Sequence, residues 1–362
     1  MFDLNRRVWL MSLLSAGLPL SAGAAVARPQ FSPLPMRFPR DFGSHPDTRT
    51  EWWYITGQLL ANDRLFGFQV TFFRARVEAA QVLQSRFAAK QLLFAHAAVT
   101  DVQGQRLLHD QRVAREGFGL AQASTADTRL TLRDWTLVRE GTEDQAPYET
   151  QVKSERFSLH LTLQPTQPLL LQGRHGWSQK GPEPVQGSHY YSQPQLHASG
   201  TLMLESRRMA VKGQAWLDHE WSDAPLPPQA VGWDWIGINL LDGGSLTAFR
   251  LRTASGSTLW DGGSYRPAGG EPYIFQAGEV EFRPVRRWKS PRSKGVYPVE
   301  WLVRTPADIY TVRALVEDQE LDSLLSTGTI YWEGLSELID SQGHPVGRGY
   351  LEMTGYAQAL RL

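Results

Sequence analysis

The feature that most constrains this chain is its rhythm of short runs, rich in aromatic and β-branched residues, separated by turn residues. The clearest example lies in residues 51–73, where the runs 51–59 and 65–73 flank the polar loop 61–64. Two such runs joined by a short polar loop predict a β-hairpin. In the second run the period of two places four apolar side chains on one face, which we expect to be the wall of a core or of an apolar cavity: Phe66, Phe68, Val70 and Phe72.

The same rhythm continues on both sides of a proline-rich break. Pro225, Pro227 and Pro228 cannot continue the interior of a sheet, so we place a domain boundary there, with one domain over residues 30–222 and a second over 223–362. One short helix is expected over residues 76–91. Strands are expected over residues 92–100, 128–137, 157–163, 196–204, 209–217, 232–241, 246–253, 297–304, 309–314, 328–335 and 349–357. The fold class is therefore all-β, with two consecutive barrels or sandwiches.

Composition narrows the possible functions. Lys and Arg total 37 against 37 Asp and Glu, so the chain lacks the excess of positive charge that sequence-independent nucleic-acid binding requires. The absence of Cys excludes disulfides, thiolate metal sites and cysteine nucleophiles. Nucleotide-binding and zinc-protease motifs are also missing, and Ser178 lacks the glycine spacing of a nucleophile elbow. We expect neither a metal nor a cofactor.

Residues 1–27 have the pattern of an export signal peptide. Arg6 and Arg7 precede an apolar stretch, and Ala25-Val26-Ala27 fits a cleavage site. The arginine pair resembles a twin-arginine signal, although ordinary export signals also contain such pairs. A membrane anchor is the alternative, but the apolar stretch is shorter than the ~20 residues that span a bilayer. We expect a periplasmic or otherwise exported protein with no transmembrane anchor after signal removal.

Several long motifs carry a family resemblance. They are residues 45–54 (HPDTRTEWWY), 176–181 (GWSQKG) leading to 189–192 (HYYS), 216–221 (WLDHEW), 331–334 (YWEG) and 349–356 (GYLEMTGY). From about residue 40 to the C-terminus the chain resembles the AttH/carotenoid 1,2-hydratase family of lipocalin-like secreted proteins. The resemblance implies two consecutive lipocalin-like β-barrels, the first ending near Trp221. Members are described as secreted hydrolases, as components encoded with an ABC-type exporter, and as cofactor-independent hydratases of a carotenoid double bond.

The segment Asp218-His219-Glu220 is the first candidate site. On a strand, Asp218 and Glu220 point to one face while His219 and Trp221 point to the other, so the three cannot converge on one metal ion. We expect His219 to transfer protons in a pocket walled by Trp221. The resemblance implies a catalytic His-x-Trp pair, which His219 and Trp221 reproduce, but the acid and Tyr that the hydratases have on the following strand are missing. Asp234 could supply the acid; the alternative is a structural role for all of these residues.

Glu51 and His96 are the other candidate catalytic residues. Glu51 shares a strand face with Trp53, and an indole beside a buried carboxyl would raise its pKa, as a general acid requires. The alternative is an ion pair of Glu51 with Arg49 or Arg74. His96 lies between small residues on an apolar strand and could complete a site with Glu51 or His219, or it could be a core histidine bonded to the backbone.

Two functional hypotheses remain. In the first, the protein is an exported hydratase or hydrolase that holds a hydrophobic, isoprenoid- or lipid-like substrate in the cleft between the barrels. In the second, it carries such a ligand without catalysis, as an accessory of an ABC-type exporter. Both expect aromatic side chains around the ligand, namely Trp53, Tyr54, Trp177, Tyr190, Trp221, Trp233 and Trp235.

Overall fold

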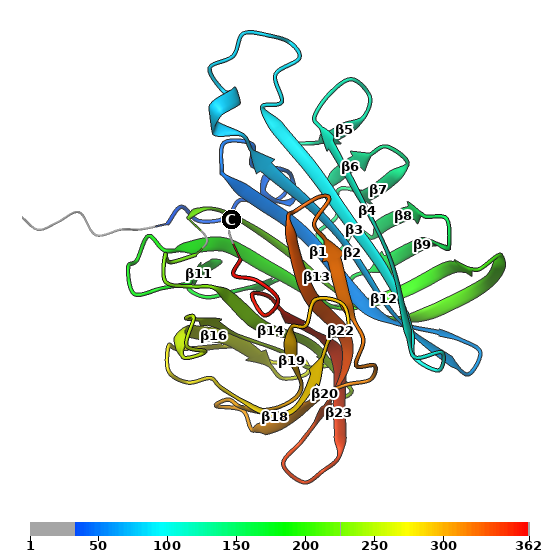
Figure 1. The fold of residues 1–362 in the computed structure, drawn as a ribbon, viewed down its shortest axis with the longest axis vertical. Helices are drawn as coiled ribbons and strands as arrows, with labels where there is room; N and C mark the ends of the chain where they lie inside the picture. The colour runs from blue at the N-terminus through cyan, green and yellow to red at the C-terminus, as the bar shows by residue number, and fades with distance from the viewer. Residues whose placement is uncertain (1–32, 225, 361–362) are drawn as a thin grey trace, which may run out of the picture. The chain divides into compact units, whose positions relative to one another are not determined.

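The computed structural model describes residues 33–224 and 226–360, which form antiparallel β-sheet almost throughout (Figure 1). The predicted export signal over residues 1–27 lies outside the described residues. In the described part of the chain, helical structure is limited to two 3-10 turns, η1 (Arg40–Phe42) and η2 (Glu78–Ala80). The helix expected over residues 76–91 is therefore reduced to η2. Among the described residues, no helix is both long and apolar enough to cross a membrane.

The first sheet curls into a nearly closed barrel. Its hydrogen-bonded order is β4-β3-β2-β1-β13-β12-β9-β8-β7-β6-β5, with β10 and β11 also paired to β12. The two ends of this order, β4 and β5, are joined by residues 116–120, and five residues span at most ~18 Å. The strands are β1 (Thr50–Ala61), β2 (Arg64–Arg76), β3 (Gln91–Asp101), β4 (Arg106–Arg115), β5 (Ala121–Ala123), β6 (Arg129–Leu132), β7 (Trp135–Arg139), β8 (Tyr148–Lys153), β9 (Phe157–Gln164), β10 (Leu170–Leu171), β11 (Trp177–Gln179), β12 (Gly187–Leu204) and β13 (Arg207–Ala224).

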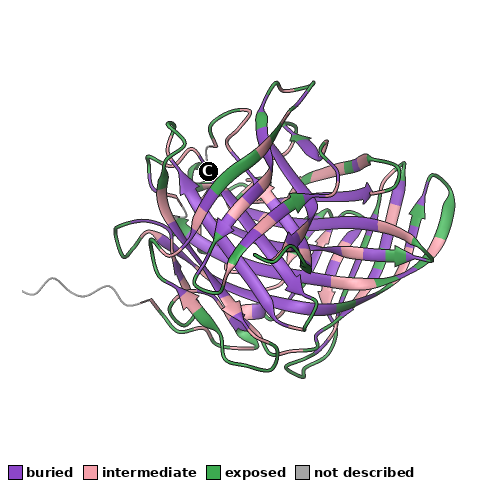
Figure 2. Cartoon of the chain, turned by 90° about the horizontal axis from the view of Figure 1, so that it is seen from below, coloured by how far each residue is buried: buried purple, intermediate pink, exposed green. Residues whose placement is uncertain are grey.

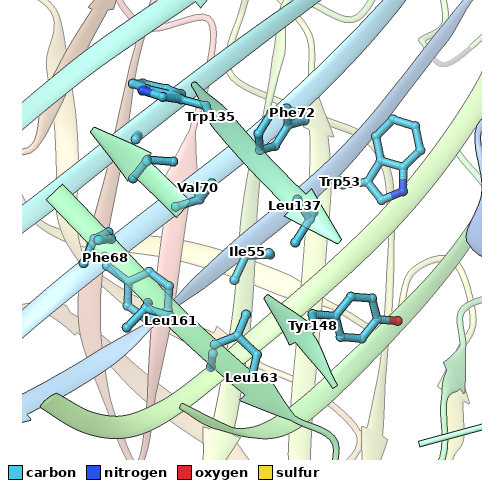
Figure 3. Close-up of a cluster of buried hydrophobic side chains, with 14 of the residues drawn as sticks. Trp53, Ile55, Phe68, Val70, Phe72, Trp135, Leu137, Tyr148, Leu161 and Leu163 are labelled. Atoms are coloured by element: carbon cyan, nitrogen blue, oxygen red, sulfur yellow. The ribbon is translucent and has the colours of Figure 1, made fainter. Parts of the chain in front are cut away.

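The interior of the first barrel is a packed apolar core. Side chains from β1 and β2 meet those of β7, β8 and β9 there, as Figure 3 shows. The predicted face of β2 is confirmed, since its four apolar side chains are fully buried in this core. The hairpin predicted over residues 51–73 is also confirmed, because β1 and β2 pair along their length. Residues 128–137 form two strands instead of one, because Arg133 adopts a φ of 58° and turns the chain between β6 and β7.

The second sheet follows the same plan. Its order is β17-β16-β15-β14-β23-β22-β20-β19-β18, with β21 paired to β22. The ends, β17 and β18, are joined by residues 276–280, so the sheet curves around its own core, which contains Trp301 and Trp332. The strands are β14 (Gly232–Leu240), β15 (Ser245–Arg252), β16 (Thr258–Arg266), β17 (Tyr273–Phe275), β18 (Glu281–Lys289), β19 (Val296–Arg304), β20 (Ile309–Ala314), β21 (Glu320–Ser323), β22 (Thr329–Ile339) and β23 (Pro345–Met353).

The two sheets pack against each other along β1, β2, β12 and β13 on one side and β14, β22 and β23 on the other. Buried residues therefore run along both faces of these strands, while exposed residues gather in the loops (Figure 2). A separate apolar cluster fills part of this interface and includes Trp216 from β13 and Trp235 from β14. The all-β, lipocalin-like fold predicted from the sequence is confirmed. The chain passes between the sheets in the segment that links β13 to β14, and the division into domains at residues 222 and 223 stays a prediction.

Candidate functional site

A cavity of about 320 Å³ lies between the two sheets, a size suited to a small organic ligand. Its walls come from the outer face of the first barrel and from β14, β15, β22 and β23 of the second sheet. The lining combines many aromatic rings with several acidic groups. The aromatic residues that line it are Trp52, Tyr54, Phe73, Phe94, Tyr190, Trp233, Trp235, Phe249 and Tyr331, and the acidic ones are Glu51, Asp218, Glu220, Glu333 and Glu352.

The strand register explains why the lining residues of the first barrel meet. Tyr54 on β1 lies opposite Asp218 on β13, which in turn lies opposite Ser192 on β12. Two residues further along the strands, Trp52 lies opposite Glu220, which lies opposite Tyr190. Because side chains two residues apart share a face, both rows point out of the barrel toward the second sheet.

Asp218 is the best-organised acidic group of the cavity. Tyr190 donates a hydrogen bond to its Oδ2 at 2.8 Å, while Ser192 and the Trp216 indole each donate to its Oδ1 at 2.6 Å. Burial, reinforced by the nearby charge of Glu220, raises the pKa of Asp218 to about 7, although these three hydrogen bonds act in the opposite direction. Asp218 can therefore hold or release a proton near neutral pH.

Glu220 has a different environment. The Lys180 ammonium lies 3.3 Å from Glu220 Oε1, and the Ser188 hydroxyl donates to the same oxygen. Lys180 also packs over the Phe249 ring at 4.2 Å, so this loop lysine bridges the two sheets. The charge of Lys180 is therefore directed at Glu220 and not at the other acidic groups of the cavity.

Glu333 and Glu352 form the acidic wall of the second sheet. They lie opposite each other on β22 and β23, and Glu352 lies opposite Trp235 on β14. Burial and the neighbouring acidic groups Asp218 and Glu220 raise the pKa of Glu352 to about 7, although Trp233 acts in the opposite direction. Burial and the charge of Glu352 hold the pKa of Glu333 well above its ordinary value.

His96 also reaches the cavity, but its partners are hydroxyl groups. Its Nδ1 lies 2.8 Å from the Tyr331 hydroxyl and its Nε2 lies 2.8 Å from the Ser326 hydroxyl, both from the second half of the chain. Burial lowers the pKa of His96 to about 3, so the ring is neutral at physiological pH. The alternative of a core histidine bonded to the backbone is wrong, since His96 links the two sheets.

His219 lies on the opposite face of β13 and does not line the cavity. It is fully buried in the first barrel, where its Nε2 lies 2.9 Å from Glu51 Oε1 and its Nδ1 lies 3.1 Å from the Tyr191 hydroxyl. Its ring stacks on Trp53 at 4.5 Å. Burial lowers the pKa of His219 to about 4, although Glu51 acts in the opposite direction. His219 therefore lies beside Glu51, one of the candidate carboxylates, but the expected pocket for it beside Trp221 is not part of this cavity.

Glu51 is held as a carboxylate, which contradicts the general-acid interpretation. Burial alone would raise its pKa, but hydrogen bonds from His219 and His45 and the Arg74 charge lower the pKa well below its ordinary value. Arg74 Nε lies 2.8 Å from Glu51 Oε2, and His45 Nδ1 lies 2.7 Å from Oε1. Of the two ion pairs considered for Glu51, the structure contains the one with Arg74. The carboxyl is ionised because its partners, unlike the indole of Trp53, are hydrogen-bond donors.

The remaining predicted residues are divided between the cavity and the barrel interiors. Trp221 does not line the cavity and is sandwiched between the rings of His45, at 3.8 Å, and His189, at 5.3 Å. Asp234 pairs with Arg250 at 2.7 Å and with Arg252 at 3.1 Å, away from the cavity lining. Trp53 and Trp177 also lie away from it, whereas Tyr54, Tyr190, Trp233 and Trp235 line it.

One group of side chains in the described part of the chain has the composition of a metal site. Ligand atoms of His45, Glu51 and His219 lie within 4.8 Å of one another. They already hydrogen-bond to each other, and the Arg74 guanidinium on Glu51 opposes a further positive charge. The geometry therefore favours a buried polar network over a cation site.

Sequence reasoning missed Glu333, Glu352 and Tyr331 as cavity residues. The signal was available in the alternation around Trp332, which is fully buried in the second core. A strand with Trp332 inside must place Tyr331 and Glu333 on its outer face. The alternation alone does not show that the first barrel covers this outer face.

Comparisons with known proteins agree with this architecture. The AttH-like family model matches residues 29–356. A crystal structure of a protein provisionally described as an AttH from Nitrosomonas europaea is 43% identical, covers 89% of this chain and 98% of that chain, and has a TM-score of 0.82.

Two more distant crystal structures share the fold. Kievitone hydratase from Nectria haematococca is 13% identical, with 90% of this chain and 94% of that chain covered and a TM-score of 0.70. CghA in complex with Sch210972 is 12% identical, with 84% and 88% covered and a TM-score of 0.51. No curated protein matches the sequence significantly. The family match and the 43% identity over nearly the whole chain establish that this chain belongs to the AttH-like family.

Proposed function

We propose that the protein binds a small, largely apolar molecule in the cavity between the sheets and that Asp218 exchanges a proton with it. The observation that carries the proposal is the position of Asp218 in an aromatic wall, with its pKa raised to about 7 by burial and by Glu220. A general acid is most effective when its pKa is near the working pH. The likeness of the fold to kievitone hydratase supports a hydratase-like reaction without identifying the substrate.

Tyr190 is the route by which this proton reaches the cavity. Its hydroxyl contacts both Asp218 Oδ2 and the Trp235 indole, at 2.8 Å and 3.3 Å. When Asp218 is protonated, it can donate to the Tyr190 oxygen, and the Tyr190 hydrogen is then free to turn toward a ligand. In a hydration, this proton would form a C–H bond at one alkene carbon. Water would form a C–O bond at the other carbon, and its released proton would return to the Asp218 carboxylate.

A carrier without catalysis is the second candidate, because the nine aromatic residues of the lining offer surface against which a hydrophobic ligand can pack. An isoprenoid- or lipid-like ligand and a role beside an ABC-type exporter belong to this candidate. Export to the periplasm also stays a prediction, as it depends on residues 1–27.

The test combines extraction of the purified protein with a turnover assay. Organic extracts are analysed by mass spectrometry for a co-purifying molecule, and wild type and Asp218→Asn are incubated with alkenes and esters of cavity size. If wild type adds one water molecule to a substrate and Asp218→Asn binds the same substrate without adding water, the result supports the enzymatic function. Binding without turnover in either protein supports the carrier, and the absence of any bound molecule contradicts both.

A further inference from the structure

The acidic wall of the second sheet is not explained by proton transfer at Asp218. Glu333 is 2% exposed, and neither of its carboxyl oxygens has a hydrogen-bond partner among the described residues. Glu352 faces it directly across the β22–β23 pair. Two acidic side chains opposite each other destabilise a sheet, and an unpartnered buried carboxyl costs more still. Keeping Glu333 and Glu352 at these positions therefore lowers the stability of the folded protein, and a ligand that pairs with them could offset this loss.

No cation of the lining neutralises this pair. Arg74 is bound to Glu51 at 2.8 Å, and Lys180 is bound to Glu220 at 3.3 Å. His96 is neutral, since burial lowers its pKa to about 3. In the part of the chain that the structure describes, neither Glu333 nor Glu352 forms an ion pair with Lys, Arg or His. The cavity thus has an excess of acidic groups on the side of the second sheet.

A second buried polar group, from the first barrel, points to the same place. The Tyr54 hydroxyl is buried, lines the cavity and has no hydrogen-bond partner among the described residues. It comes from the first barrel and lies close enough to Glu333 for each group to shift the pKa of the other, so the two groups face the same part of the cavity. The rings of Trp235 and Tyr331 line the cavity beside them, on the same sheet as the two acids. Aromatic faces and carboxylates together form the environment that binds organic cations in proteins.

We propose that Glu333, Glu352 and the Tyr54 hydroxyl form a subsite for a protonated amine, so that the ligand of this cavity is an apolar molecule carrying a cationic nitrogen. This proposal rests on the proposed function, because it places the nitrogen in the same cavity. On binding, Glu333 and any protonated Glu352 would release their protons to solvent, because a neighbouring cation favours the ionised acids. The ammonium group would then lie between the two carboxylates with an aromatic face beside it, and the Tyr54 oxygen would accept one of its hydrogens. The apolar body of the ligand would extend toward Asp218 and Tyr190.

The test uses three probes with one apolar body and different charges. They are 2-(2-naphthyl)ethylamine, 2-(2-naphthyl)ethanol and 2-naphthylacetate, and binding to the full chain is measured by calorimetry and by quenching of tryptophan fluorescence at neutral pH. We expect the amine to bind at least ten-fold more tightly than the alcohol, a difference of about 1.4 kcal/mol, and the carboxylate to bind most weakly.

Two variants test whether the preference for the amine over the alcohol comes from the proposed subsite. Glu333→Gln should weaken the amine about ten-fold and leave the alcohol unchanged. The matched control is Glu337→Gln on the same strand, which pairs with Arg313 outside the cavity lining and should change neither. Thermal unfolding verifies that each variant is folded.

The outcomes separate the two proposals. If the alcohol or the carboxylate binds as tightly as the amine, or if Glu333→Gln leaves the preference intact, the cationic subsite is overturned while the cavity remains the binding site. If none of the probes binds and extraction yields no bound molecule, the proposed function fails and the amine subsite fails with it.

Discussion

Asp218 and His219 are consecutive in the sequence but face opposite sides of β13. Asp218 lines the cavity between the sheets, whereas His219 is sealed inside the first barrel against Trp53 and Glu51. The strand thus separates two polar groups that serve different purposes. One is a carboxyl with a pKa near 7 beside open space, and the other belongs to a fully bonded network that ties β1, β2 and β13 to the segment around His45.

The raised pKa of Asp218 predicts a pH-dependent difference in stability between wild type and Asp218→Asn. Between the unfolded value near 4 and the folded value of about 7, the folded chain keeps a proton that the unfolded chain releases. This contribution is fully present below about pH 4 and is lost as the pH rises through 7. Relative to wild type, Asp218→Asn should therefore gain roughly 1 kcal/mol of unfolding free energy per pH unit between pH 5 and 7.

Urea unfolding at pH 5, 6, 7 and 8 measures this difference. Glu352 adds to it in the same direction, because the Asp218 charge helps to raise the pKa of Glu352 and its loss in Asp218→Asn lowers that pKa. Asp63→Asn, in the exposed β1–β2 turn, is the control for the same chemical change made outside the cavity. A constant difference between Asp218→Asn and wild type would show that Asp218 is ionised throughout.

Glu51→Gln should destabilise the protein strongly. The change leaves the Arg74 guanidinium, which is 2% exposed, without its charged partner. Breaking a buried pair on one side costs about 3–5 kcal/mol, because the remaining charge stays buried. Glu78→Gln removes the partner of Arg76 at an exposed site and should cost less than about 1 kcal/mol. Chemical denaturation measures the free energy of unfolding of both variants. Equally small decreases in this free energy would show that Glu51 is not part of a buried network.

The sequence predicted the strands and their alternation better than it predicted which face of β13 lines the cavity. The alternation of side chains placed Asp218 and His219 on opposite faces of one strand, and the structure confirms this. The sequence did not predict that the cavity lies on the Asp218 face and not on the His219 face, because the outer face of the first barrel becomes a cavity wall only when the second sheet covers it. That packing depends on contacts such as His96 with Tyr331, 235 residues apart.

The sequence left two interpretations of Glu51 open, a raised pKa beside an indole and an ion pair with Arg49 or Arg74, and the structure contains the ion pair with Arg74. An indole neighbour suggested a raised pKa, but Arg74 and His45 approach from a neighbouring strand and from the segment before β1 and lower it. Likewise, Glu333 and Glu352 become a pair only through the β22–β23 register.

Tyr190→Phe should raise the pKa of Asp218 further. The Tyr190 hydroxyl donates to Asp218 Oδ2 and stabilises the ionised form, so its removal favours the protonated acid. Tyr148→Phe is the matched control, because the Tyr148 side chain is also buried but lies in the core of the first barrel and does not contact Asp218. Carboxyl titrations followed by NMR should show an upward shift in the first variant alone. An unchanged or lowered midpoint in Tyr190→Phe would contradict the proposed relay.

The imidazole of His96 should stay neutral across the working pH range. Burial lowers its pKa to about 3, and both ring nitrogens contact hydroxyl groups. Nitrogen NMR shifts of labelled histidine, assigned with His96→Gln, should not change between pH 5 and 8. A titration in that range would mean that the ring gains charge and that the link to Tyr331 and Ser326 opens.

The most direct measurement is the titration of the Asp218 side-chain carboxyl in the wild-type protein. Carbon-13 NMR of aspartate-labelled protein, with the signal assigned by its loss in Asp218→Asn, follows this group from pH 4 to 9. We predict a midpoint near 7, as expected for a proton donor in the cavity wall. A midpoint at or below the ordinary aspartate value near 4 would leave the cavity without its acid and contradict the proposed chemistry.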